Sequence, residues 1–563
     1  MLKSFPRHEA RQVDCLDGLW EFAFLGSCDV EEIWLDEIAW NDRMMVPAAF
    51  DAMPSYAGKR GVAAYRLRFF AACETALSLH FEAVSLWCRV FVDGQALRDH
   101  ACGTTGFWCD VPPSPSTKRE LVVLVDNRFD FERVPLHEAF FDFYQWGGII
   151  RSVWCHKVPE TFLETVQVRV EDYQNGALTA HIRLGGKVPE TIELRTRIDG
   201  EDEQNHSARV SPEGCLEVSL QVQDPRRWSP ARPQLHHLCV QMGADDMTVR
   251  FGLRQVKAQN GEILLNGEAV KLRGYNRHES HPQFGPALPA AQLLADLQLL
   301  RDLGCNFIRG SHYPQDQRFL DLCDEMGFLV WEECIGWGQR ERQLTDAGFI
   351  AAHGAAVEEM VKASFNHPSI ICWGFLNEAG TDSEYARPIM EATAAQLRRL
   401  DPTRLITYAT MFGKTDLFLE LADIISINIY PGWYGCQDAE DPLGLVVPSI
   451  RSFLDHFDAR GWAEKPILIS EIGAEGLYGW HDALNGFFTE EYQAELLRLT
   501  CEEVISNPRL AGVALWHFSD ARTYTGGYAL GRPRAFNNKG TLDEYRRPKL
   551  AYKAVQRVFK SVS

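Results

Sequence analysis

The feature that most constrains the fold is a regular alternation in the second half of the chain. From about residue 256, short apolar runs typical of buried strands alternate with amphipathic segments typical of helices, as in AAQLLADLQLLRDLGCNFIRGSHYP at 290–314. Eight such units follow one another, from AVKLRGYN at 269–276 to the closing helix at 548–562. Eight strand–helix units within roughly 300 residues predict a (β/α)8 TIM barrel over 256–563.

The first 255 residues have a different hydrophobic pattern. Runs such as ELVVLVDNR at 120–128 and LTAHIRL at 178–184 alternate apolar and polar residues with period two, and turn residues separate them. This pattern is typical of antiparallel β-sandwiches. A change in the pattern of alternating runs near residue 160 divides this region into two parts. We therefore expect a multidomain protein with β-sandwiches at 1–160 and 161–255 before the barrel.

The charge of the chain limits its partners. Its 77 acidic and 57 basic residues give a net charge of −20, which repels nucleic acid and anionic membrane surfaces. No run of about 18 apolar residues predicts a membrane span, and MLKSFPRHEA lacks the apolar core of a signal peptide. The 15 cysteines are scattered singly, which favours buried thiols over disulfides or zinc ligands. We therefore expect a cytoplasmic protein.

Two predicted barrel strands end on a carboxylate. IICWGFLNEAG at 370–380 places Glu378 after the fourth strand, and KPILISEIGAEG places Glu471 at the end of the seventh. Catalytic residues of TIM barrels lie at the carboxyl ends of the strands, so both side chains can point into one mouth. Two carboxylates across a pocket are what cleavage of a glycosidic bond requires.

With these two motifs and its order of domains, the whole chain resembles the glycoside hydrolases of family 2, and among them the β-glucuronidases. The resemblance implies a jelly-roll-like sugar-binding sandwich, an immunoglobulin-like sandwich and a catalytic barrel. It also implies that Glu378 is the acid/base, that Glu471 is the nucleophile, and that the reaction retains the anomeric configuration without metal or organic cofactor. Asn377 matches the family residue that hydrogen-bonds the sugar 2-hydroxyl.

The resemblance extends to the residues that would bind an acidic sugar. Asn537 and Lys539 in FNNKG match the Asn-x-Lys motif with which β-glucuronidases bind the sugar carboxylate. Four residues before Asn537, where these enzymes commonly have Arg, this chain has Pro533 between Arg532 and Arg534. A neighbouring guanidinium, for which we select Arg534, could serve instead, and galacturonic acid could then be accepted or preferred.

Six further residues are candidates for the lining of the site. Tyr430 and Tyr434 match two family tyrosines, and Tyr430 could donate to Glu471. Each of three candidates also has a purely structural interpretation. Tyr434 could pack at the barrel rim, Asp142 could be a loop acid that caps a turn, and Trp516 could belong to the barrel core. His278 lies in HESH, which lacks the HExxH spacing of a zinc site. The six candidates are Asp142, His278, Arg309, Tyr430, Tyr434 and Trp516.

The leading interpretation is a β-glucuronidase that acts on small glucuronides or uronic acid disaccharides, and relatives of this type are often dimers or tetramers. A β-galacturonidase or dual enzyme is the nearest alternative. A neutral β-galactosidase or β-mannosidase of the same family would not depend on Lys539. From another class, a non-catalytic carbohydrate-binding protein would tolerate loss of both glutamates. The short segment after the third strand predicts an open mouth.

Overall fold

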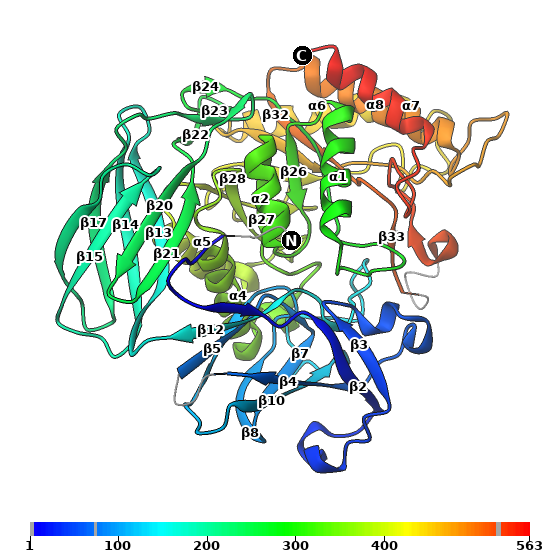
Figure 1. Ribbon diagram of the computed structural model, residues 1–563. Coiled ribbons are helices and arrows are strands. Elements are labelled where there is room, and N and C mark those ends of the chain that lie inside the picture. The colour runs from blue at the N-terminus through cyan, green and yellow to red at the C-terminus, as the bar shows by residue number, and fades with distance from the viewer. Residues whose placement is uncertain (1–4, 72–75, 525–530, 563) are drawn as a thin grey trace.

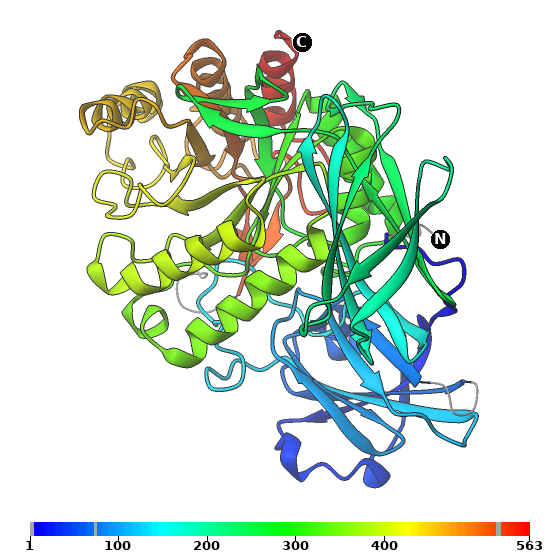
Figure 2. The ribbon, with the colours of Figure 1, turned by 90° about the vertical axis from the view of Figure 1, so that its left-hand side faces the viewer.

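The computed structural model describes residues 5–71, 76–524 and 531–562. Figures 1 and 2 show three lobes: a sandwich at the bottom, a second sandwich at the side, and the barrel. None of the helices in the described residues combines the length and the apolar character that crossing a membrane requires.

The first lobe packs a six-stranded antiparallel sheet on a four-stranded one. The larger sheet has the order β3 (Asp42–Val46), β2 (Gly18–Gly26), β4 (Val62–Phe70), β10 (Lys118–Asp126), β7 (Trp87–Val92) and β8 (Gln95–His100). The smaller has the order β1 (Val13–Cys15), β12 (Val153–Val158), β5 (Ala76–Phe81) and β9 (Phe107–Val111), and a short pair joins β6 (Val84–Ser85) to β11 (Gly148–Ile149). The period-two runs of the sequence form these strands.

The second lobe is a smaller sandwich. One sheet contains β13 (Thr161–Asp172), β14 (Ala177–Gly186) and β17 (Cys215–Gln221), and the other has the order β16 (Gln204–Arg209), β15 (Thr191–Ile198), β20 (His236–Met242) and β21 (Asp245–Phe251). In β17 every second side chain is buried, which is how an alternating sequence forms a one-sided sheet. The short strands that follow are β18 (Trp228–Ser229), β19 (Arg232–Pro233), β22 (Val256–Gln259), β23 (Glu262–Leu265) and β24 (Glu268–Ala269).

The third lobe is a closed barrel of eight strands, which confirms the predicted fold class. Its strands are β25 (Leu272–Asn276), β26 (Phe307–Gly310), β27 (Leu329–Glu333), β28 (Ile370–Asn377), β29 (Leu405–Thr410), β30 (Ile425–Asn428), β31 (Ile467–Glu471) and β32 (Leu510–Leu515). All neighbours are parallel, and β25 pairs with β32 to close the ring. Because helices cover the outside, the strands are buried on both faces and read as continuous apolar runs.

The helices of the barrel follow its strands in chain order. They are α1 (Ala290–Leu303), α2 (Gln317–Met326), α3 (Glu341–Leu344), α4 (Ala347–Ser364), α5 (Arg387–Leu400), α6 (Val446–Ala459), α7 (Glu490–Ser506) and α8 (Leu550–Lys560). A further strand pair, β33 (Ala521–Arg522) with β34 (Phe536–Asn537), lies after β32.

One predicted helix is absent. The alternating pattern of the barrel predicts a helix in DLFLELAD at 416–423, before the sixth strand, but this segment consists of turns and bends. Its first residue, Asp416, is buried and accepts hydrogen bonds from Tyr408 Oη at 2.7 Å and from the backbone N of Phe418 at 2.9 Å. The side chain that could begin a helix is thus anchored to the barrel, and the backbone turns around it.

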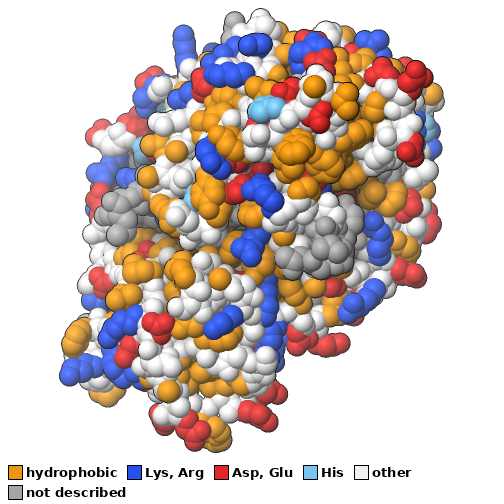
Figure 3. Space-filling model, turned by 90° about the vertical axis from the view of Figure 1, so that its right-hand side faces the viewer, with side chains coloured by type: hydrophobic (Ala, Val, Ile, Leu, Met, Phe, Trp, Pro, Cys, Tyr) orange, Lys and Arg blue, Asp and Glu red, His pale blue; other side chains and the backbone are white. Residues whose placement is uncertain are grey.

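The two sandwiches are joined to the barrel in different ways. The second lobe contacts its side, where Arg250 of β21 binds Asp321 of α2 at 2.7 Å. The first lobe lies at its mouth, where Phe143 packs against the rings of His278 and His312. Figure 3 shows Lys and Arg side chains along the boundary between the first lobe and the barrel.

Glycine 374 offers a test of how tightly the barrel is packed. A Cβ on Gly374 in β28 would lie 1.9 Å from Nε1 of the buried Trp331. Gly374→Ala should therefore lower the free energy of unfolding by about 1–3 kcal/mol, measured from the thermal unfolding transition of the barrel. The matched control is Gly354→Ala in α4, where the nearest atom lies at 3.5 Å and the helix favours alanine. Equal stability of the two variants would contradict this packing.

Candidate active site

Both glutamates lie at the mouth of the barrel, in the expected order. Glu378 directly follows β28, the fourth barrel strand, and Glu471 is the last residue of β31, the seventh. Between Gly374 and Asn377 the pairing of β28 with β29 is irregular, and Glu378 has a left-handed backbone with φ 53°. This bulge turns the chain so that the end of the strand faces the mouth. Glu471 is only 2% exposed, whereas Glu378 is partly exposed.

The guanidinium of Arg309, at the end of β26, connects the polar groups of the site. It donates to Glu471 Oε1 at 2.9 Å and to Asn377 Oδ1 at 2.8 Å. On its other edge it donates to both oxygens of Glu333, at 2.9 and 3.0 Å. The side chain is fully buried, so these contacts replace its hydration. The structure therefore brings Arg309, Asn377 and Glu471, three of the candidate site residues, into direct contact.

Asn428, at the end of β30, completes the link between the two glutamates. Its Nδ2 donates to Glu378 Oε1 at 2.9 Å and to Asn377 Oδ1 at 3.1 Å, and its Oδ1 accepts from Ser470 Oγ at 2.7 Å. The Nδ2 of Asn377 is buried and has no partner among the described residues. That amide is therefore the donor that a bound ligand can use.

The surroundings of the two carboxyl groups differ. Burial raises the pKa of both, and repulsion from Glu378 adds to this for Glu471. Glu471 accepts from the cationic Arg309 and from Tyr430 Oη at 2.7 Å, whereas Glu378 accepts from the neutral Asn428. Charge-assisted donors stabilise a carboxylate more than neutral donors do. A proton shared by the pair therefore resides on Glu378, and Glu471 carries the charge.

A second cluster, which we call the cation pocket, consists of Asp142, Tyr434, Glu475, Arg532 and Lys539. Lys539 Nζ donates to Tyr434 Oη at 2.9 Å and to Glu475 Oε1 at 3.4 Å. Arg532 donates to Asp142 and Glu475, and to Tyr434 Oη at 3.1 Å. The rings of Tyr430 and Trp433 also lie within 5.7 Å of the Lys539 ammonium. Since Tyr430 also donates to Glu471, it joins the pocket to the carboxyl groups of Glu471 and Glu378.

The structure places Arg532, and not Arg534, in the cation pocket. Arg534 Nη1 binds Glu544 Oε1 at 2.9 Å, and its Nη2 donates to Asn538 Oδ1 at 2.8 Å. Both Arg534 and Ala535 have positive φ, so the turn sends the side chains of Arg532 and Arg534 in different directions. Asn537 lies beside the pocket and donates to Asp142 Oδ2 at 3.1 Å.

The remaining candidates line the wall next to the first lobe. Trp516 stacks on His312 with ring centroids 5.0 Å apart and meets His278 edge-on at 5.4 Å. His278 Nδ1 bonds Tyr313 Oη at 3.2 Å, and burial holds the pKa of His278 well below its ordinary value. His278 is therefore neutral, and its buried Nε2 has no partner among the described residues. Trp516, at 5% exposure, offers a ligand only part of its ring.

Sequence reasoning did not identify three groups that the site uses. Glu333 and Asn428 end the third and sixth strands, so strand ends alone could have indicated them. Glu475 lies four residues after Glu471, in the loop sequence GAEG. Apart from its carboxylate, nothing in the sequence marks it as a site residue. All three are buried polar residues that hold a cation or a catalytic group.

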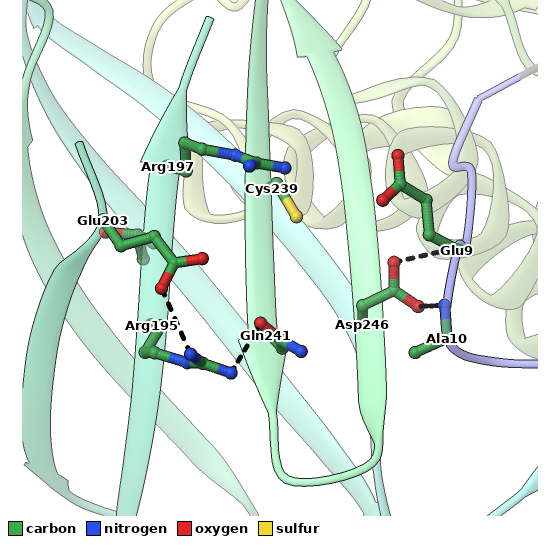
Figure 4. Close-up of a pocket in the computed structure, with 9 residues that line it drawn as sticks. Glu9, Ala10, Arg195, Arg197, Glu203, Cys239, Gln241 and Asp246 are labelled. Atoms are coloured by element: carbon green, nitrogen blue, oxygen red, sulfur yellow. Dashed lines mark hydrogen bonds and ion pairs between the residues drawn. The ribbon is translucent and has the colours of Figure 1, made fainter. Parts of the chain in front are cut away.

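Two other clusters were considered as sites. Asp321, Asp324 and His367 could offer three ligand atoms to a metal, but Arg250 already binds both acids, at 2.7 and 3.5 Å. A pocket of about 270 Å³ lies between the second lobe and the N-terminal segment, and Figure 4 shows Arg195, Arg197 and Asp246 around it. It contains none of the residues around Glu378 and Glu471.

Comparison with known proteins gives a consistent result. Curated β-glucuronidases from Streptococcus agalactiae serotype V and from human are 27% and 26% identical to this chain; they align with 96% and 97% of it and with 94% and 90% of their own lengths. A solved family 2 β-galacturonidase from Eisenbergiella tayi, bound to galacturonate, is 32% identical with a TM-score of 0.91, and all of both chains is covered.

A β-D-glucuronidase structure from Dictyoglomus thermophilum shares the fold, with 24% identity, a TM-score of 0.86, and coverage of 99% of this chain and 98% of that one. The family profile "Glycosyl hydrolases family 2" matches residues 161–254, and "Glycosyl hydrolases family 2, TIM barrel domain" matches 256–563. With its barrel matched throughout, the chain belongs to the glycosyl hydrolases of family 2.

Proposed function

We propose that this glycoside hydrolase is a β-D-uronidase that removes a terminal β-linked uronic acid with retention of configuration. The observation that carries the proposal is the cation pocket. Its buried Lys539 and Arg532 both bind Tyr434, whose ring packs on that of Tyr430, the tyrosine that donates to Glu471. A neutral sugar has no use for two buried cations. A sugar carboxylate, by contrast, needs such partners to leave water.

The proposed reaction uses the two glutamates in turn. Glu471, kept ionised by Arg309 and Tyr430, attacks the anomeric carbon while Glu378 gives its proton to the leaving oxygen. The glycosidic C–O bond breaks and a covalent glycosyl-enzyme forms. Glu378, now a carboxylate, removes a proton from water, which attacks the same carbon and releases Glu471. The free amide N–H of Asn377 is the proposed donor to the sugar 2-hydroxyl.

The epimer of the uronic acid separates two candidates. The sequence motifs and the curated relatives favour glucuronides. Two observations favour galacturonides. Arg532 contributes a guanidinium to the pocket, although the position where glucuronidases commonly have arginine is Pro533 in this chain. The chain is also similar to the E. tayi β-galacturonidase. Comparing kcat/KM for the p-nitrophenyl β-D-glucuronide and β-D-galacturonide decides between them.

Two further expectations stay with the proposal. We propose a cytoplasmic location, supported by the fourteen cysteines of the described residues, all of which have free thiols. We also propose a homo-oligomer, a dimer or tetramer, on the resemblance to related enzymes. Light scattering of the purified protein tests the second expectation.

The pH profile tests the roles of the glutamates. The rate should fall as the pH rises into the alkaline range, because burial raises the pKa of Glu378, and above that pKa the pair loses the proton that the leaving oxygen needs. Glu378→Gln should abolish this basic limb, and for a sugar leaving group it should lower kcat/KM by about 10²–10⁴-fold. Glu384→Gln, an exposed acid in the same loop, is the control. A basic limb that persists in Glu378→Gln would assign the proton elsewhere.

Replacement of the pocket lysine tests the substrate class. Lys539→Met keeps much of the side-chain volume but removes the charge, so kcat/KM for the preferred p-nitrophenyl uronide should fall by about 10²–10³-fold. The rate on the matching neutral glycoside, glucoside or galactoside, should change far less. Arg534→Ala, outside the pocket, should leave the ratio of the two rates unchanged. An equal loss on acidic and neutral substrates would contradict a uronidase.

A further inference from the structure

The wall beside the acid/base is formed by one loop, Gly336–Arg340, between β27 and α3. Three hydrogen bonds tie it to the end of β28: Gly338 N donates to Asn377 O at 2.8 Å, Gly380 N donates to Gln339 O at 2.9 Å, and Arg340 Nη1 donates to Glu378 O at 2.6 Å. Because Glu378 protonates the leaving oxygen in the proposed reaction, this loop borders the space of the leaving group and not that of the uronic acid.

Arg340 presents a fixed cation at this border. Its Nη1 also donates to Gln339 O at 3.0 Å, so two carbonyls hold one edge of the guanidinium. The residue is exposed, and no described carboxylate lies within 4.0 Å of it. Burial raises the pKa of Glu378, and the charge of Arg340 partly opposes that effect. On the other edge Nη2 donates to the Met411 sulfur at 3.9 Å, a weak acceptor that a carboxylate can replace.

The neighbouring charges do not neutralise Arg340. Glu138, across the loop, accepts from Gln343 Nε2 at 2.8 Å and lies 4.0 Å from Arg342. Glu341, the next residue in the chain, is exposed to solvent, and its carboxylate lies more than 4.0 Å from the Arg340 guanidinium. The guanidinium is thus the local charge that faces the leaving-group side.

Apolar side chains continue this border. Phe140 of the first lobe is 44% exposed and packs on Trp337 with ring centroids 6.1 Å apart. Met411 is 48% exposed, and its sulfur lies 3.9 Å from Arg340 Nη2. Exposed apolar groups beside a fixed guanidinium suit a ligand with a flat hydrophobic face and an acidic group.

We propose that Arg340, Trp337 and Phe140 form a leaving-group subsite for a second uronic acid, so that the enzyme acts on acidic disaccharides. The inference rests on the proposed function and adds the class of the leaving group to it. A chain with a net charge of −20 repels a doubly acidic substrate at long range, so each carboxylate needs its own local cation. Lys539 and Arg532 would bind the first, and Arg340 the second.

The test compares two disaccharides that differ by one carboxylate. Both carry the preferred terminal β-uronic acid, linked in one to galacturonic acid and in the other to galactose. The measured quantity is the acidic-to-neutral ratio of kcat/KM for these disaccharides. Any change of Arg340 that alters the pKa of Glu378 acts on both substrates, and therefore cancels in the ratio.

In the wild-type enzyme the acidic-to-neutral ratio should exceed one. Arg340→Gln should lower it about tenfold or more, chiefly through KM, and Arg340→Lys should restore part of it. Arg342→Gln is the matched control and should leave it unchanged. Thermal unfolding establishes that each variant is folded.

Three outcomes would overturn the inference. The ratio may be the same in Arg340→Gln as in the wild type. Alternatively, Arg340→Gln may lower only the rate on a 4-carboxyphenyl uronide relative to the phenyl uronide, which would assign the subsite to aromatic acids. Finally, the wild-type enzyme may cleave neither p-nitrophenyl uronide; the proposed function then fails, and the inference fails with it.

Discussion

The active site depends on one buried cation, the guanidinium of Arg309. It reaches groups at the ends of four other barrel strands: Asn276, Glu333, Asn377 and Glu471. A fully buried guanidinium without partners would cost several kcal/mol, so each of these contacts is also a condition for folding. Although burial opposes it, Arg309 brings the pKa of Glu333 below its ordinary value. Glu333 thus stays charged and fixes the guanidinium, whose other edge is then oriented toward Glu471.

The cation pocket is also a cluster of charged side chains that hold one another, but here cations and acids are equal in number. Its two cations, Lys539 and Arg532, are matched by two acids, Asp142 and Glu475. Burial opposes ionisation of Glu475, but Lys539 and Arg532 bring its pKa below the ordinary value, so it remains charged. A uronate that enters this neutral cluster must compete with Glu475 for Lys539. In the proposed function, selectivity for acidic sugars therefore depends on how closely Glu475 holds the ammonium, and not on the presence of the lysine alone.

Periodicity predicted the features of this protein that repeat, and local backbone geometry decided those that do not. Eight apolar runs indicated the barrel, and their carboxyl ends located Glu378 and Glu471, because a strand end has a fixed position in this fold. The choice between Arg532 and Arg534 depended on two positive φ angles in one turn, which nothing in GRPRAF announces. The expected helix near 416–423 failed because the tertiary contacts of Asp416 outweighed local propensity. Glu475 was missed since no period marks a loop carboxylate.

The first lobe is part of the chemistry of the barrel. Its loop supplies Asp142, which binds Arg532 and Asn537 in the cation pocket, and Phe140, which packs on Trp337 beside Glu378. In the proposed function, two residues separated by one position thus border opposite sides of the bond that is cleaved. The carboxyl oxygens of Asp142 accept from Arg532 and Asn537 of the barrel, so these contacts also fix the position of the loop. The same ion pair that prepares the site for an acidic sugar therefore holds Phe140 against the leaving-group wall.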